Sequence, residues 1–129
     1  MNRILVVEDE ELIRTMIEIN LESQDFCVRS CESAEDMMEI LEEDTFDLIL
    51  LDVFLPGMNG DKALREIRKK SIQTPVIMVT AKNSLQTKLD SFEHGADDYI
   101  SKPFDVQELR ARIKALIRRR NPEFGAKNS

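Results

Sequence analysis

The chain has 129 residues, of which 42% are hydrophobic and 33% are charged, and its formal net charge is −7 at pH 7. This length predicts one domain with enough apolar residues to form a core, which excludes a disordered or fibrous protein. No stretch approaches the roughly 20 apolar residues of a membrane span, and the negative charge opposes nonspecific binding to nucleic acid.

Four short apolar runs and a fifth expected strand, 26–31, alternate with helical patterns along the chain. Unbroken runs rich in Val and Ile are typical of strands in a parallel sheet that is covered on both faces. The strands are expected at 3–7, 26–31, 47–51, 75–79 and 98–101. The helices are expected at 10–23, 33–44, 59–70, 84–94 and 105–120. The expected fold is therefore α/β, a doubly wound (βα)5 domain with a five-stranded parallel sheet in the order 2-1-3-4-5.

Each expected helix repeats apolar residues at helical spacing, so each has a face to lay on the sheet. In the first helix these residues are Leu12, Ile13, Met16 and Ile17. Capping patterns support three of the helix starts. Ser33 precedes Asp36 and Asp105 precedes Glu108 by three residues, and Asn83 or Ser84 stands before Leu85.

The cysteines and the amino-terminal residues predict the compartment. Cys27 and Cys31 lie four residues apart on the second expected strand, so their Cα atoms would be about 13 Å apart, beyond disulfide reach. With no His or Cys partner nearby, a metal role for them is not expected. The first strand begins directly after Met1 and Asn2, which leaves no room for a signal peptide. We expect a cytoplasmic protein with no membrane partner.

Four of the five strands end at a reactive polar group. These groups are Glu8 and Asp9 after the first strand, Asp52 after the third, Thr80 after the fourth and Lys102 after the fifth. Ligands of open parallel sheets bind outside the carboxyl ends of the strands, and in the order 2-1-3-4-5 these four strands are neighbours. Each residue alone could be an ordinary loop or surface residue, but together they predict a site for a divalent cation and a phosphoryl group.

The same residues fall in motifs that identify a family. The motifs are Val7-Glu8-Asp9, Asp52 followed by Leu55-Pro56-Gly57 and Gly60, Val79-Thr80-Ala81, and Lys102-Pro103-Phe104. In this order and at these spacings, the chain resembles the receiver domain of two-component response regulators, which has a CheY-like fold. Two further segments, 95–100 and 108–113, resemble the OmpR/PhoB-like subfamily, whose receivers precede a winged-helix DNA-binding domain.

The resemblance implies that Asp52 accepts a phosphoryl group from the phosphohistidine of a sensor histidine kinase, which forms an aspartyl phosphate. Lys102 would place positive charge on the phosphoryl group, and Thr80 would donate a hydrogen bond to it and draw the following loop inward. The Lys102-Pro103 peptide is expected to be cis. The expected catalytic activity is limited to this self-phosphorylation and a slow autodephosphorylation.

A metal ion is also expected at this site. Glu8, Asp9 and Asp52 would bring negative charges together, which favours a hard cation with oxygen ligands such as Mg²⁺. The resemblance implies that Asp9, Asp52 and the backbone carbonyl of Phe54 bind Mg²⁺ directly and that Glu8 assists. Phe54 departs from the common family pattern, in which Met or a small or polar residue is more frequent, so the dephosphorylation rate is open.

The resemblance further implies a switch that ends in a dimer. Tyr99 would report the movement of Thr80, and the surface formed by 84–94, 98–101 and 105–120 would change. The charged residues of this surface, the expected dimer face, are Lys88, Asp97, Asp98, Glu108, Arg112 and Arg119. In a two-fold homodimer Lys88 would pair with Glu108, Asp98 with Arg112, and Asp97 with Arg119. The alternative is that these are solvated surface charges.

The output depends on the rest of the protein. Residues 1–120 are expected to form the receiver, and 121–129 lack an apolar pattern, so we expect a linker, tail or cloning remnant there. The resemblance implies transcription regulation, with DNA bound only through an effector domain that is absent from this chain. The alternative is a stand-alone receiver that acts by protein contact or as a phosphorelay intermediate.

Other classes of protein fit the residues less well. A flavodoxin-like cofactor domain needs a hydroxyl-rich or Gly-rich phosphate loop after the first strand, where this chain has Glu8-Asp9-Glu10-Glu11. A hydrolase of the haloacid dehalogenase type needs a second acid two residues after the nucleophile, where Phe54 stands. A receiver that is never phosphorylated is a third possibility, against which the complete set of strand-end residues argues.

Overall fold

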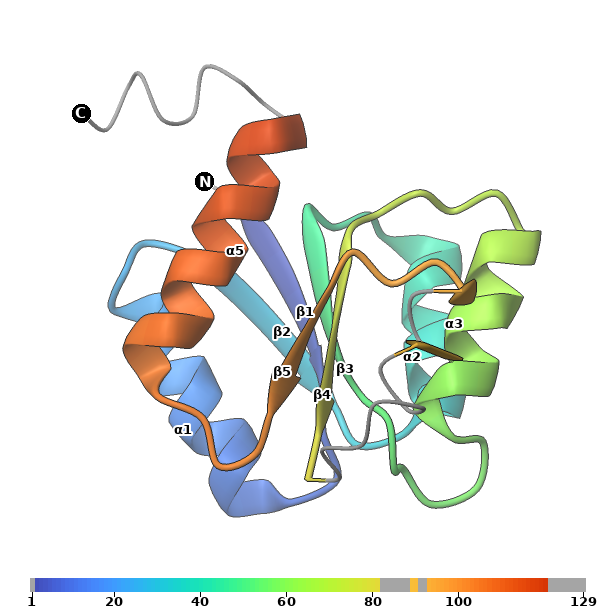
Figure 1. Ribbon diagram of the computed structural model, residues 1–129, viewed down its shortest axis with the longest axis horizontal. Coiled ribbons are helices and arrows are strands. Elements are labelled where there is room, and N and C mark those ends of the chain that lie inside the picture. The colour runs from blue at the N-terminus through green and yellow to red at the C-terminus, as the bar shows by residue number, and fades with distance from the viewer. Residues whose placement is uncertain (1, 82–88, 91–92, 121–129) are drawn as a thin grey trace.

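The computed structural model describes residues 2–81, 89–90 and 93–120 (Figure 1). Its elements are β1 (Arg3–Val7), α1 (Glu11–Glu22), β2 (Cys27–Cys31), α2 (Ala34–Glu43), β3 (Leu48–Asp52), α3 (Gly60–Lys69), β4 (Val76–Thr80), β5 (Asp98–Ser101) and α5 (Val106–Arg120). Each lies within two residues of its predicted bounds. Most of the predicted helix 84–94 and all of the predicted tail lie outside the described residues.

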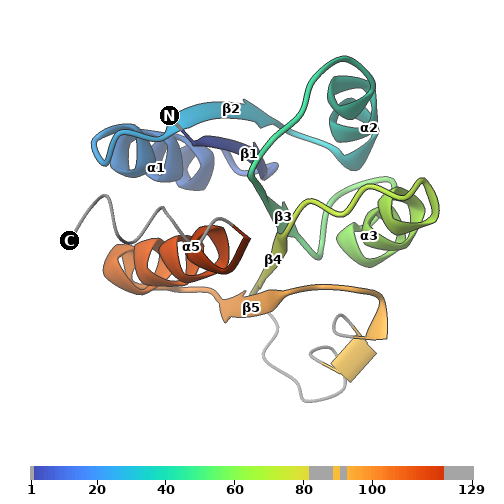
Figure 2. The ribbon, with the colours of Figure 1, turned by 90° about the horizontal axis from the view of Figure 1, so that it is seen from above.

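The five strands form one parallel sheet in the order β2-β1-β3-β4-β5, which confirms the predicted fold class. Helices α1 and α5 cover one face of the sheet, and α2 and α3 cover the other (Figure 2). This arrangement gives the sheet two separate hydrophobic layers.

Strand β1 shows how the sequence pattern produces these two layers. Ile4 and Val6 pack into the layer beneath α1 and α5, whereas Leu5 and Val7 pack into the layer beneath α2 and α3. All four side chains are buried because successive strand residues point to opposite faces and both faces are covered. An unbroken apolar run is therefore what a central strand of this sheet requires.

Side-chain caps begin the helices on the α2 and α3 side. The backbone N–H of Asp36 donates to Ser33 Oγ at 3.1 Å, which confirms the predicted cap of α2. Asn59, which no capping pattern had indicated, accepts a hydrogen bond from the N–H of Lys62 at 2.9 Å and begins α3. The turn before α5 is closed differently from the prediction, because Asp105 accepts from the N–H of Gln107 at 2.7 Å.

Helix α1 departs from its predicted packing. Ile17 and Leu21 are buried against the sheet, but Leu12 is 87% exposed, Ile19 is 62% exposed and Met16 lies at the surface. The prediction that Leu12 and Met16 lie on the buried face was therefore wrong. Apolar residues occupy more of the circumference of this helix than the sheet can cover, so tertiary packing selects only part of them.

Both cysteines are free thiols, as predicted, with Cys27 exposed and Cys31 buried. Burial raises the pKa of Cys31 to about 11, so this thiol is protonated at neutral pH. Within the described ranges, no helix combines the length and apolar character needed to cross a lipid bilayer.

Candidate functional site

The carboxyl ends of four strands bring their polar residues to one edge of the sheet. Asp52 is the last residue of β3 and Thr80 is the last of β4, while Glu8 and Lys102 directly follow β1 and β5. The strand register aligns these ends, since Val7 lies opposite Leu51, Asp52 opposite Val79, and Thr80 opposite Ser101. The convergence predicted from the sequence is present.

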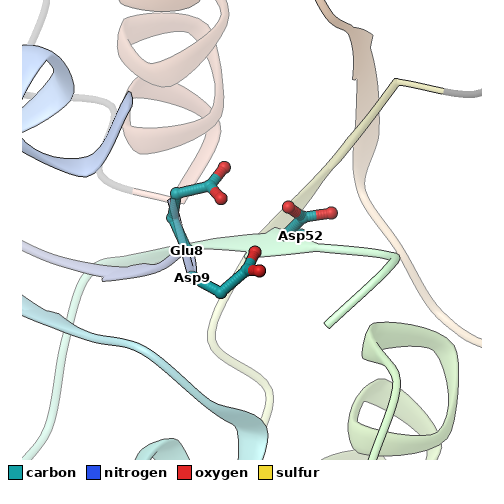
Figure 3. A group of neighbouring side chains, drawn as sticks. All are labelled: Glu8, Asp9 and Asp52. Carbon is teal, nitrogen blue, oxygen red and sulfur yellow. The ribbon is translucent and has the colours of Figure 1, made fainter. Parts of the chain in front are cut away.

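Three carboxylates form an acidic cluster at this edge. Glu8, Asp9 and Asp52 each offer an oxygen atom, and these atoms lie within 4.8 Å of one another (Figure 3). Glu8 is 2% exposed and Asp52 is 4% exposed, whereas Asp9 lies at the surface. The cluster is thus two buried acids with a third, solvent-accessible one beside them.

The ammonium of Lys102 lies between the two buried acids. Its Nζ lies 2.6 Å from Glu8 Oε1 and 2.9 Å from Asp52 Oδ2. The backbone N–H of Lys102 donates to the carbonyl of Thr80 at 2.7 Å, and the Lys102-Pro103 peptide is cis, as expected. One ammonium therefore bridges residues that follow β1 and end β3.

Burial and mutual contacts shift the pKa values of Glu8 and Lys102. Burial raises the pKa of Glu8, although the hydrogen bonds from Lys102 and from the N–H of Glu10 oppose the shift. Burial would lower the pKa of Lys102, but hydrogen bonds and charge interactions with Glu8 and Asp52 outweigh it and raise the pKa. Three carboxylates with one ammonium leave negative charge that a divalent cation would balance.

The loop after β3 contacts the side chain of Asp52. The N–H of Phe54 donates to Asp52 Oδ1 at 2.9 Å, so both carboxylate oxygens have a donor. The N–H of Gly60 donates to the carbonyl of Val53 at 2.8 Å. A Cβ at Gly60 would lie only 2.1 Å from the backbone oxygen of Asp52, so only glycine permits this close turn.

Thr80 and Tyr99 meet inside the molecule, on neighbouring strands. Thr80 is fully buried and Tyr99 is 6% exposed. Burial raises the pKa of Tyr99, and a side-chain hydrogen bond with Thr80 partly opposes the shift. The structure thus connects the residue at the site to the aromatic residue beside it.

The family model of the response regulator receiver domain matches residues 4–114. The chain belongs to this family. This membership agrees with the predicted fold, and the family implies a histidine kinase as partner.

Relatives extend this assignment. The receiver is 42% identical over 115 residues to an uncharacterized transcriptional regulatory protein, YkoG, of Bacillus subtilis, which covers 89% of this chain and 50% of the relative. It is 44% identical over 119 residues to the response regulator ArlR of Staphylococcus saprophyticus. This match covers 92% of this chain and 54% of the relative. The chain spans about half the length of these curated relatives, whose names support the OmpR/PhoB-like subfamily.

A solved structure agrees with the same fold. The receiver domain of the Francisella response regulator 1452 superposes with a TM-score of 0.90 at 28% identity, which covers 94% of this chain and 100% of that one.

The expected dimer face is only partly described, because Lys88 lies outside the described residues. Arg112 Nη1 contacts both carboxylate oxygens of Asp98, at 2.9 and 3.0 Å, and its Nε lies 3.6 Å from Glu108 Oε1. Arg119 is exposed at the end of α5. The receiver therefore already pairs Asp98 with Arg112 inside one chain.

Two arginines that contact the acidic cluster or the dimer face were not predicted from the sequence. Arg14 Nη1 donates to the carbonyl of Glu8 at 2.9 Å and thus supports the segment that carries the acids. Arg68 binds the segment before β5, including Asp97. The contacts of Arg68 join residues distant in the chain, so no local spacing indicates them.

Proposed function

We propose that this receiver is a phosphorylation-dependent switch in which Asp52 accepts a phosphoryl group from the phosphohistidine of a sensor histidine kinase. The observation that carries the proposal is the environment of Asp52, a buried carboxylate at a strand end, 2.9 Å from Lys102 and beside Glu8 and Asp9. The family membership supports the same role.

In the proposed reaction an oxygen of Asp52 forms a bond to phosphorus while the bond from phosphorus to the histidine nitrogen breaks. The leaving imidazole takes up a proton. A carboxylate is a weak nucleophile, so orientation and charge neutralisation must provide most of the rate. The hydrogen bond from Phe54 orients Asp52, and the ammonium of Lys102 would move to the phosphoryl oxygens.

The donor set fits Mg²⁺, which prefers oxygen ligands and retains waters. Asp9 and Asp52 would hold it directly with the carbonyl of Phe54, and Glu8 would assist. When bound, the ion would neutralise charge on the phosphoryl group. Asp9 is the accessible member of the cluster, which suits a ligand reached from solvent.

The proposed output starts at Thr80. If its hydroxyl donates to a phosphoryl oxygen, the hydrogen bond that it shares with Tyr99 is lost or rearranged. Tyr99 lies on β5, beside Asp98 and its partner Arg112, so the change reaches the expected dimer face. We propose that phosphorylation favours a two-fold dimer through this face and that residues 1–120 are the unit that switches.

The final effect would be transcription regulation through an effector domain outside the receiver. The support is that one relative is named a transcriptional regulatory protein and that the chain matches only about half of each relative.

The assignment of Asp52 is tested with acetyl phosphate and Mg²⁺. Mass spectrometry should detect one added phosphoryl group in the wild type and none in Asp52→Asn. Asp25→Asn is a matched control, because Asp25 has φ of 67° in a turn and asparagine tolerates this conformation. Equal phosphorylation of Asp52→Asn would contradict the proposal.

A further inference from the structure

The side chain of Arg68, in the last turn of α3, binds two separate segments, 72–74 and 95–97. Its Nη1 donates to the carbonyls of Ile72 and Thr74, both at 2.8 Å. Its Nε and Nη2 donate to the carbonyl of Gly95 at 3.1 and 2.9 Å, and Nη2 also contacts Asp97 Oδ2 at 3.1 Å. One guanidinium therefore joins the end of α3, the entry to β4 and the entry to β5.

The segment before β5 packs closely against this guanidinium. Gly95 has φ of 103°, which is strained for a residue with a side chain, and a Cβ there would lie 3.1 Å from Arg68 Nε and crowd this side chain. The segment that leaves α3 and the segment that enters β5 reach the sheet at the same end (Figure 1). The Arg68 side chain is only 22% exposed, which fits a bridge between them.

Asp97 is held on two sides. Its Oδ2 accepts from Arg68 and from the N–H of Val76 at 2.9 Å, and its own N–H donates to the carbonyl of Val76 at 2.9 Å. The other carboxylate oxygen, Oδ1, makes no hydrogen bond within the part of the chain that the structure describes, and the side chain is 40% exposed. Asp97 is thus anchored by one oxygen, and the other carries no hydrogen bond from the described residues.

Asp97 adjoins Asp98, which pairs with Arg112 of α5. We propose that Arg68 is a positioning residue for the dimer face: it fixes Asp97 and the entry to β5, so that the acidic residues are already ordered when a second copy binds. This inference rests on the dimer proposed above. Ordering the side chains beforehand lowers the entropy cost of association.

The test compares dimerisation of the Mg²⁺ and beryllofluoride-bound protein by sedimentation at low salt. Arg68→Ala should raise the dimer dissociation constant roughly tenfold, because a two-fold interface uses the residue twice. Arg65→Ala removes the same charge from an exposed position one turn earlier and should leave the constant unchanged. Both variants should be phosphorylated at the wild-type rate.

A double-mutant cycle separates positioning from general stability. If Arg68 acts through Asp97, adding Arg68→Ala to Asp97→Ala should weaken the dimer by less than twofold further. Full additivity, or tighter dimerisation of Arg68→Ala, would overturn the inference. Arg68→Lys provides a variant that keeps the charge and the fold but loses the planar fork, and it should also weaken the dimer. Wild-type dimerisation by Arg68→Lys would show that charge, not position, matters.

Two results identify which proposal fails. A wild type that stays monomeric with beryllofluoride would contradict the dimer itself and the role given to Arg68 in it. A wild type that dimerises, with Arg68→Ala unchanged, would contradict only the inference about Arg68. Amide exchange of Val76 in the monomer should be faster in Arg68→Ala than in Arg65→Ala, and equal exchange would show that Arg68 does not fix Asp97.

Discussion

Glu8 and Asp9 are neighbours in the chain but lie in different environments. Glu8 is buried and binds Lys102, whereas Asp9 is exposed at the rim of the acidic cluster. Burial raises the pKa of Glu8 and makes this acid a costly place for an unpaired charge. Asp9 carries no such cost, so it is the acid best placed to replace a water molecule bound to Mg²⁺.

Asp9→Ala should therefore weaken Mg²⁺ binding by at least about tenfold, because a direct oxygen ligand is lost. Isothermal titration calorimetry measures the affinity. Glu10→Ala removes the adjacent exposed acid and should leave the affinity within about twofold. If both variants bind equally well, the metal is bound elsewhere.

The ion pair of Asp44 and Arg3 makes stability depend on pH in the acid range. The bidentate contact with the Arg3 guanidinium lowers the pKa of Asp44 to about 2, from an ordinary value of 3.8. Its contribution to the free energy of unfolding is complete above the ordinary value and is lost as the pH falls through the folded value. Stability from this pair should thus decline between about pH 4 and pH 2.

Asp44→Asn tests this pair. The free energy of unfolding, measured in urea at several pH values, should change less steeply with pH in this variant than in the wild type over that range. Asp25→Asn serves as the control. A variant that keeps the wild-type slope would show that the acid sensitivity arises at other carboxylates.

At the scale of elements, helix α1 shows how the sheet selects among apolar residues. Ile17 and Leu21 lie one turn apart on the buried side, while Leu12 and Ile19 are exposed. The contribution of each residue to stability depends on the layer it contacts and not on its hydrophobicity alone.

Ile17→Ala should lower the free energy of unfolding by about 2 to 4 kcal/mol, since it opens a cavity in a packed layer. Leu12→Ala should change it by less than about 0.5 kcal/mol, because an exposed side chain loses little contact. Urea denaturation measures both values. Comparable losses in the two variants would mean that α1 is rotated relative to the sheet.

In the whole molecule, the charged residues of α5 lie on two different sides of the helix. Glu108, Arg112 and Arg119 lie on the side expected to form the dimer, whereas Arg118 lines a groove beside α1. Arg119 makes no ion pair with the described residues. A substitution that reverses its charge therefore disturbs no contact described within the chain. Arg112 is less suitable for this purpose because it also binds Asp98.

Arg119→Glu should raise the dissociation constant of the beryllofluoride-bound dimer roughly tenfold, since each of the two expected contacts with Asp97 becomes repulsive. Arg118→Glu makes the same charge change one residue away and should have a smaller effect. Sedimentation at two salt concentrations measures both, and added salt should weaken the wild-type dimer. A dimer insensitive to Arg119→Glu would exclude this pairing.

Local patterns were sufficient to predict the strand ends and therefore the site. An aliphatic run ending at Asp52 or Thr80 identifies the end of a buried strand, and parallel strands place those ends at one edge. The sheet order and the convergence of the strand-end residues followed from these local signals together with general rules of connection. The family motifs had the same origin, since each is a short run around one strand end.

Only the tertiary structure decided which neighbour each polar group meets. Burial of Glu8 beside Lys102, exposure of Leu12 and the contacts of Arg68 each depend on residues far apart in the chain. Hydrophobic periodicity reports which side of an element can be buried, but it does not report how much of that side the neighbouring layer covers. Long charged side chains reach several segments, so their partners become defined only when the helices are packed on the sheet.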